Sequence, residues 1–137
     1  MGKKTAAALK IEENNDTADY NRPERAFERL FHGRVTKPDP IHIVSREEFA
    51  ESDDEYDFKP DFQFIGTNVL VPIQGPYHRT KRQQSKDRWR NSCLLALNYR
   101  VIEIDTELIM TKRYNAEMVA KVEAFLKGNR LSEHLYA

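Results

Sequence analysis

Residues 60–78 read PDFQFIGTNVLVPIQGPYH, and this segment decides the fold of the chain. Its apolar and β-branched residues fall into two runs, 62–65 and 69–73, separated by Gly66-Thr67-Asn68. Short runs of this composition around a turn sequence predict two antiparallel strands joined as a hairpin. Pro72 has no backbone N–H, so the second strand is expected to be an edge strand or to contain a bulge there.

The segment after the hairpin predicts a helix over 83–98 and a strand over 99–104. A strand, a helix and a second strand in succession form a unit in which the two strands run parallel. The antiparallel hairpin and this parallel unit together predict an α/β domain with a small mixed sheet flanked by helices. We expect Asp87 on the side of this helix that faces solvent or the active site. The opposite side is expected to bury Trp89, Cys93, Ala96 and Leu97.

Three further elements complete the expected domain. A helix is predicted from Asn21 to Arg34, a short strand over 41–44 and a last helix over 115–126, which Gly128 ends. The polar residues 1–19 are expected to form a flexible tail. The predicted organisation is therefore a tail over 1–19, one domain over 20–127 and a C-terminal tail over 128–137.

Composition limits the possible classes of protein. The chain has 137 residues, enough for one domain, and its 22 basic residues balance 22 acidic ones, so it is no general polycation. The single cysteine, Cys93, excludes an internal disulfide and a multi-cysteine zinc cluster. The sequence shows neither a signal peptide nor a run of about 20 apolar residues. We therefore expect an intracellular protein, cytoplasmic or associated with the nucleoid, without contact to a membrane.

The charges are segregated along the chain. Residues 47–57 carry seven acids and no base, whereas residues 79–90 carry six bases and one acid. The basic segment suits contacts with nucleic-acid phosphates, although a solvated helix face is the alternative. The acidic segment is either a loop held away from DNA or a part that reaches toward a metal ion. The expected nucleic-acid-binding residues are Arg79, Lys81, Arg82, Lys86, Arg88 and Arg90.

A series of short motifs resembles the very-short-patch-repair-like branch of the PD-(D/E)XK nuclease superfamily, which includes small phage and homing endonucleases. The motifs are Glu24, Pro60-Asp61-Phe62, Ile73-Gln74-Gly75-Pro76-Tyr77-His78, Asp87-Arg88-Trp89-Arg90 and Asn98-Tyr99-Arg100-Val101-Ile102. The resemblance covers residues 22 to about 110. It implies a restriction-endonuclease-like core and metal-dependent hydrolysis of DNA, in a phage or mobile-element context.

The resemblance assigns roles to individual residues. Asp61 corresponds to the metal-binding aspartate, Glu24 to the glutamate of the first helix, and His78 to the general base. Glu28 is the alternative to Glu24. Asp87 corresponds to the acidic position of the following helix, and Arg90 to its basic position. The implied cofactor is Mg²⁺ or Mn²⁺, with Asp61 and Glu24 as its ligands.

Two departures from the family pattern affect the expected activity. Many members of the superfamily have a second carboxylate on the strand and a lysine two residues later, where this chain has Gln74 and Pro76. Two-metal chemistry is therefore disfavoured, and Gln74 is expected to contact water, phosphate or metal through its amide. The cysteines of the structural zinc site in mismatch-repair members are also missing, which disfavours repair of T:G mismatches.

The chemistry expected from these residues agrees with the resemblance. A carboxylate such as Asp61 suits Mg²⁺, and a neutral imidazole such as His78 accepts a proton from water near pH 7. Each residue alone also has a structural explanation: Asp61 as the start of a strand, His78 as a turn residue, and Asp87 with Arg90 as an ordinary ion pair within a helix.

We therefore expect a metal-dependent DNA endonuclease that nicks DNA or makes double-strand breaks, as a homodimer or with a partner protein that confers specificity. One alternative is a catalytically inactive nuclease-fold protein that acts as a DNA-binding or structural subunit of a larger assembly, such as a phage particle. A second alternative is a protein-interaction module that uses the acidic segment 47–57.

Overall fold

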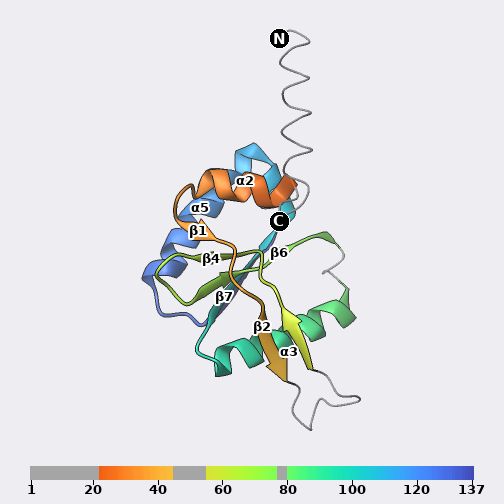
Figure 1. Cartoon of the computed structure of the whole chain (residues 1–137). Helices are drawn as coiled ribbons and strands as arrows, with labels where there is room; N and C mark the ends of the chain where they lie inside the picture. Colours follow the sequence, from red (N-terminus) through yellow and green to blue (C-terminus); the bar gives the residue numbers. More distant parts are fainter. Residues whose placement is uncertain (1–21, 45–54, 77–79) are drawn as a thin grey trace, which may run out of the picture.

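A mixed six-stranded sheet lies at the centre of the protein (Figure 1). The structure, a computed structural model, describes residues 22–44, 55–76 and 80–137. Strands β1, β4, β5 and β7 follow one another across the sheet, and β6 and β8 each pair with β7. The bounds are β1 (Val35–Thr36), β4 (Phe62–Phe64), β5 (Val69–Val71), β6 (Ile73–Gln74), β7 (Arg100–Asp105) and β8 (Ser132–Leu135). The expected mixed sheet flanked by helices is confirmed.

The predicted hairpin and parallel unit are both present. Strands β4 and β5 are antiparallel, and β5 and β6 both run parallel to β7. Val69 pairs with Arg100 and Ile73 with Ile104, which is the same register, so β5 and β6 are two segments of one strand. The interruption is Pro72, whose carbonyl oxygen accepts a hydrogen bond from Ile104 N at 3.1 Å. The edge position expected at Pro72 is confirmed: β5 is paired on both sides, but its pairing with β4 ends at Val71, and β6, which follows the proline, is the last strand of the path and pairs with β7.

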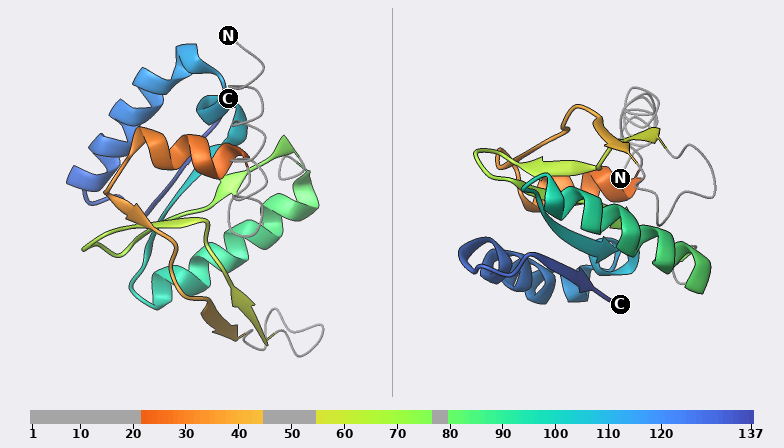
Figure 2. Two further views of the ribbon diagram at one scale, coloured as in Figure 1. Left: turned by 45° about the horizontal axis from the view of Figure 1, so that its top comes forward. Right: turned by 90° about the horizontal axis from the view of Figure 1, so that it is seen from below.

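Successive residues of the strands point to opposite faces of the sheet, and each face carries its own apolar core. One face packs against α2 (Arg22–Leu30), α4 (Thr106–Met110) and α5 (Lys112–Lys127). The other face packs against α3 (Lys81–Ala96) and the antiparallel pair β2 (Ile41–Val44) and β3 (Glu55–Phe58). Figure 2 shows α2 near α5, and α3 with the β2–β3 pair on the other side of the strands.

Helix α3 does not bury the side that its apolar residues predict. Its buried residues are Asp87, Arg90 and Leu94, whereas Trp89 and Cys93 are half-buried, and Ala96 and Leu97 are exposed. Asp87 was expected to face either solvent or the active site, and it does not face solvent, because it is buried. The reason is that polar residues cover the sheet beneath the first half of α3, so the inward side of the helix is polar there.

Two further expectations need correction. Residues 128–137 were expected to form a tail, but they contain β8, which pairs in parallel with β7. Only Leu135 of β8 is buried, so the strand lacks the apolar alternation by which strands are recognised. The last residues of the acidic segment form β3 rather than a loop, whereas 47–54 and the predicted tail 1–19 lie outside the described residues.

No helix within residues 22–44, 55–76 and 80–137 is both long enough and apolar enough to cross a bilayer.

Candidate functional site

The carboxyl groups of Glu24 and Asp61 meet at one edge of the α2 face. Phe27 on α2 stacks on Phe62 of β4, with 5.3 Å between the ring centroids. Glu24 precedes Phe27 by one helical turn, and Asp61 immediately precedes Phe62, so this aromatic contact brings the two carboxyl groups together. Glu24 is 8% exposed, and its Oε1 accepts a hydrogen bond from Lys37 Nζ at 3.0 Å. The sequence predicted this pairing through the family resemblance.

The surroundings of the Asp61 carboxyl group shift its pKa. Its pKa is raised to about 7, first by burial and then by the hydrogen bond and the charge of the Glu24 carboxyl group. The backbone N–H of Ile73, which donates to Asp61 Oδ2 at 2.7 Å, and the charge of Lys37 act in the opposite direction. Two carboxyl groups in contact cannot both ionise without cost, so they share a proton near neutral pH.

Such a pair suits a hard divalent cation. The cation removes the repulsion between the carboxylates, and Mg²⁺ in proteins is commonly bound by one or two carboxylates with water or phosphate oxygens at its other positions. In the described parts of the chain no three His, Cys, Asp or Glu side chains lie close enough together to hold a metal ion. Asp61 and Glu24 fit Mg²⁺ or Mn²⁺ as two anionic protein ligands. Gln74 is neutral and adds no third anionic ligand.

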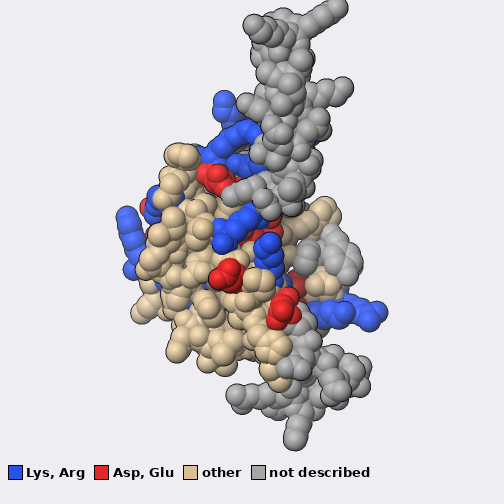
Figure 3. Space-filling view, in the orientation of Figure 1, with Lys and Arg blue, Asp and Glu red and all other residues tan. Residues whose placement is uncertain are grey.

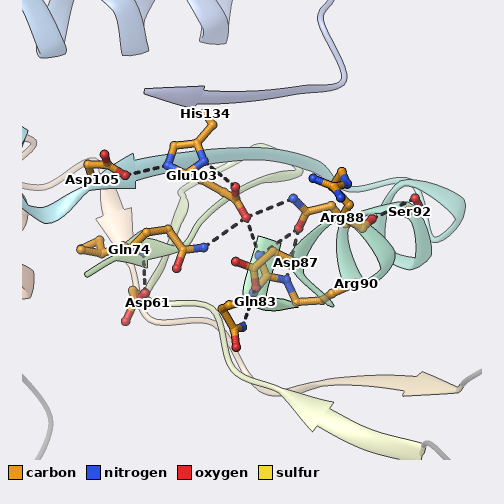
Figure 4. Close-up of polar contacts among 12 residues, drawn as sticks. Asp61, Gln74, Gln83, Asp87, Arg88, Arg90, Ser92, Glu103, Asp105 and His134 are labelled. Carbon is orange, nitrogen blue, oxygen red and sulfur yellow. Dashed lines mark hydrogen bonds and ion pairs between the residues drawn. The ribbon is translucent and has the colours of Figure 1, made fainter. Parts of the chain in front are cut away.

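A second polar cluster lies between β6, β7 and α3, and Glu103 is its centre (Figure 4). Glu103 Oε1 accepts hydrogen bonds from Arg90 Nη2 at 2.6 Å, Asn91 Nδ2 at 3.1 Å and Gln74 Nε2 at 3.1 Å. Its other oxygen, Oε2, lies 3.1 Å from His134 Nδ1. Burial raises the pKa of Glu103, but His134, Arg90 and Asn91 together bring it below its usual value. Glu103 is thus ionised, and both of its carboxylate oxygens have partners.

Arg90 belongs to this cluster rather than to the protein surface. Its side chain is 9% exposed, its Nη1 lies 3.4 Å from Asp87 Oδ1, and its guanidinium covers the ring of Phe58 at 4.4 Å. Asp87 also accepts a hydrogen bond from Gln83 Nε2 at 3.0 Å. The expected phosphate contact of Arg90 is therefore unsupported, because its guanidinium is buried between two carboxylates. Asp87 likewise has a structural role in this pairing.

Gln74 is buried and oriented by its neighbours. Its side-chain amide donates to Glu103, and its backbone carbonyl accepts a hydrogen bond from Thr106 Oγ1 at 3.0 Å. The side chain is part of the layer that the strands present to α3, where Gln74 lies opposite Asp105 in the register. Figure 4 shows the Gln74 side chain directed toward Glu103, while Asp61 accepts its hydrogen bond from the backbone N–H of the preceding residue, Ile73.

His134 was left unassigned on sequence and is the main addition from the structure. Its Nε2 lies 2.7 Å from Asp105 Oδ1, and its Nδ1 faces Glu103. A neutral imidazole has a single N–H, so only the protonated ring donates to both carboxylates. Burial lowers the pKa of His134, but the hydrogen bonds and charges of Glu103 and Asp105 raise it overall. The ring also stacks on Tyr136, with 3.9 Å between centroids.

The stability that His134 adds should depend on pH. Because its pKa is higher in the folded state than in the unfolded state, its contribution is complete below about pH 6.5 and is lost as pH rises through the folded pKa. We expect His134→Gln to lose stability relative to wild type at pH 6, and the loss to shrink toward pH 9. Urea unfolding across this range measures the difference, with His32→Gln, an exposed histidine, as the control. A loss that is the same at every pH would contradict this role.

The remaining expected site residues divide into two groups. His78 and Arg79 lie outside the described residues. Four cations of α3 are exposed, as phosphate contacts require: Lys81, Arg82, Lys86 and Arg88. Thr80 caps the N-terminus of α3, because its Oγ1 accepts a hydrogen bond from Gln83 N.

Comparisons of the chain with protein-family models, with curated proteins and with solved structures gave no match.

Proposed function

We propose that this protein is a metal-dependent DNA endonuclease with a restriction-endonuclease-like core. The observation that carries the proposal is the pair Glu24 and Asp61, in which a buried carboxyl group has its pKa raised to about 7 beside a second one. Perturbed carboxyl pairs are typical of functional sites, although structural networks also produce them. The succession of α2, the β4–β5 hairpin, α3 and β7 gives the order of elements that the resemblance implies.

Each residue of the candidate site has its own role in the proposed reaction. Asp61 and Glu24 would hold Mg²⁺ or Mn²⁺, and the backbone N–H of Ile73 fixes the orientation of Asp61. When bound there, the cation would supply charge neutralisation and polarisation of a phosphodiester. His78, four residues after the end of β6, accepts the proton of the attacking water, a role that rests on the family resemblance. The exposed cations of α3 bind phosphates of the DNA backbone.

A catalytically inactive relative that only binds DNA is the second candidate. It is favoured by Gln74, whose amide is engaged by Glu103 at the position where a second strand carboxylate is expected. Such a protein keeps the fold and the basic surface of α3 but lacks cleavage. Binding and cleavage must therefore be measured on the same preparations.

The test is nicking of supercoiled plasmid by purified protein in Mg²⁺ or Mn²⁺, with EDTA as the blank. We expect nicking by wild type and a loss of at least about 100-fold in Asp61→Ala and in His78→Ala, because each change removes a group that acts on the reacting atoms. Asp39→Ala, which removes an exposed acid, is the matched control and should nick at the wild-type rate. Salt-sensitive DNA binding by wild type without nicking in either metal would replace the endonuclease with the inactive relative.

A further inference from the structure

Glu103 fixes which way round the side-chain amide of Gln74 lies. Gln74 Nε2 lies 3.1 Å from Glu103 Oε1, and both residues are buried, with 2% of Gln74 and 6% of Glu103 exposed. The pKa of Glu103 is below its usual value, so its carboxylate is ionised and can only accept hydrogen bonds. The NH₂ end of the Gln74 amide must therefore face Glu103, and the carbonyl oxygen Oε1 points away from it, as Figure 4 shows.

The oxygen Oε1 of Gln74 is open to a ligand. The Gln74 side chain has no hydrogen bond with the described residues other than the one to Glu103. Within the same parts of the chain, no fully buried side-chain nitrogen or oxygen lacks a partner, so Oε1 belongs to the small accessible part of Gln74. Carbonyl oxygens are suitable ligands for Mg²⁺ and Mn²⁺.

Gln74 is next in sequence to the residue that orients Asp61. The backbone N–H of Ile73 donates to Asp61 Oδ2 at 2.7 Å. Consecutive Cα atoms are about 3.8 Å apart, so the Gln74 side chain starts one residue away from the carboxyl pair of Glu24 and Asp61. A neutral oxygen on Gln74 is thus available to the same cation as the two carboxylates.

Glu103 is itself held in one position, unlike the charges at the surface. On the face of the molecule in Figure 3, acidic and basic side chains lie near one another in contact with solvent, which screens them. Glu103 instead accepts hydrogen bonds on Oε1 from Arg90 and Asn91, and Oε2 faces His134. A partner fixed in this way orients a metal ligand, and such partners contribute to metal affinity.

We propose that Glu103 is a positioning residue of the candidate metal site, because it orients Gln74 so that Oε1 serves as a neutral ligand beside Glu24 and Asp61. This inference rests on the proposed metal-dependent function. The carboxylate at the N–H end of the amide also polarises it, which makes the carbonyl oxygen a stronger ligand. The second strand carboxylate of the superfamily pattern is then replaced by a glutamine and a carboxylate on the neighbouring strand.

The experiment measures the dissociation constant of Mn²⁺ by electron paramagnetic resonance at one fixed pH. The proteins are the wild-type full chain, Gln74→Leu, Glu103→Gln and the double variant. Leucine removes Oε1, whereas glutamine at position 103 keeps the shape of Glu103 but can donate as well as accept, so it no longer fixes the Gln74 amide. We expect each single variant to bind Mn²⁺ about 10-fold more weakly than wild type. The double variant should bind no more weakly than Gln74→Leu alone.

Asn91→Ala is the matched control, because it removes another partner of the same Glu103 oxygen and leaves Gln74 in contact with Glu103. It should bind Mn²⁺ as wild type does. Unchanged binding in either single variant overturns the inference while metal binding stands. Losses that multiply in the double variant also overturn it, because Glu103 would then act independently of Gln74. Absence of Mn²⁺ binding by wild type overturns the proposed function and the inference together.

The carbon-13 signal of Gln74 Cδ in wild type gives a measurement that does not depend on the folding of a variant. Added Mg²⁺ should shift this signal together with that of the Asp61 carboxyl carbon. A shift at Asp61 without one at Gln74 Cδ would show that the cation binds without Oε1, and the inference would be wrong.

Discussion

Arg90→Met is expected to destabilise the fold by about 3 to 5 kcal/mol, the largest effect of any single substitution considered. Arg90 lies between Asp87 and Glu103, and all three side chains are less than 10% exposed. Methionine fills much of the space but carries no charge, so the buried Asp87 and Glu103 lose the cation between them, and Glu103 keeps His134 as its cationic partner. Chemical denaturation with far-UV circular dichroism measures the loss.

Arg88→Met is the matched control, because Arg88 lies two residues away on the exposed side of α3. Its effect should stay within about 0.5 kcal/mol. Adding Asp87→Asn to Arg90→Met should recover part of the loss, because it removes a buried charge whose ion pair with Arg90 is gone. Equal stability of the Arg90 and Arg88 variants would show that Arg90 is not buried between carboxylates, and the phosphate-binding role expected from sequence would then return.

Asp61→Asn is expected to stabilise the protein at pH 8 while abolishing metal-dependent cleavage. In the folded state the pKa of Asp61 is raised from 3.8 to about 7, so the native state holds a proton that the unfolded state has released. Each pH unit within that window costs about 1.4 kcal/mol of stability. The penalty is absent below about pH 3.8, grows through the window and is complete above about pH 7.

Asparagine mimics the protonated carboxyl group. Its oxygen still accepts the hydrogen bond from Ile73 N, and its amide donates to the Glu24 carboxylate, so the repulsion within the pair disappears. The gain in stability at pH 8 should reach up to about 4 kcal/mol and should vanish toward pH 4. Unfolding free energies of both proteins from pH 4 to 8 measure it. Asp39→Asn, an exposed acid, should show no such trend.

Binding of a divalent metal should also remove the repulsion between the Glu24 and Asp61 carboxylates and so stabilise the folded state. Saturating Mg²⁺ should stabilise wild type at pH 8, because a ligand that binds only the folded state raises its stability. The Asp61→Asn variant should gain little, because one of the two anionic ligands is gone. A lower stability of the variant at pH 8, together with an equal response to Mg²⁺, would mean that Asp61 is an ordinary structural residue at the start of a strand.

The architecture was largely predictable from local patterns. The apolar runs around Gly66-Thr67-Asn68 and the strand–helix–strand succession predicted a mixed sheet, and the structure confirms it. Strand β8 escaped prediction because an edge strand that buries only Leu135 carries no periodic signal. The buried side of α3 was mispredicted for a related reason: Asp87 and Arg90 are stabilised inside by each other and by Glu103, and a hydrophobicity pattern contains no information on such pairing.

The candidate site was predictable in part. The Glu24–Asp61 pairing was implied by the family resemblance, and Phe27 against Phe62 supplies its physical cause. His134 was missed because its partners, Glu103 and Asp105, lie 31 and 29 residues earlier in the sequence. A signal was nevertheless present: a strand with two carboxylates on the same face as Val101 requires buried cations nearby.

The central claim is that the carboxyl pair of Glu24 and Asp61 binds a divalent cation, and the titration of Asp61 tests it most directly. Carbon-13 NMR of the labelled side chain reports its protonation as pH is varied, with and without Mg²⁺. We predict a pKa of about 7 without metal and a clearly lower one with saturating Mg²⁺. A pKa close to the ordinary 3.8 that does not move when Mg²⁺ is added would contradict the claim.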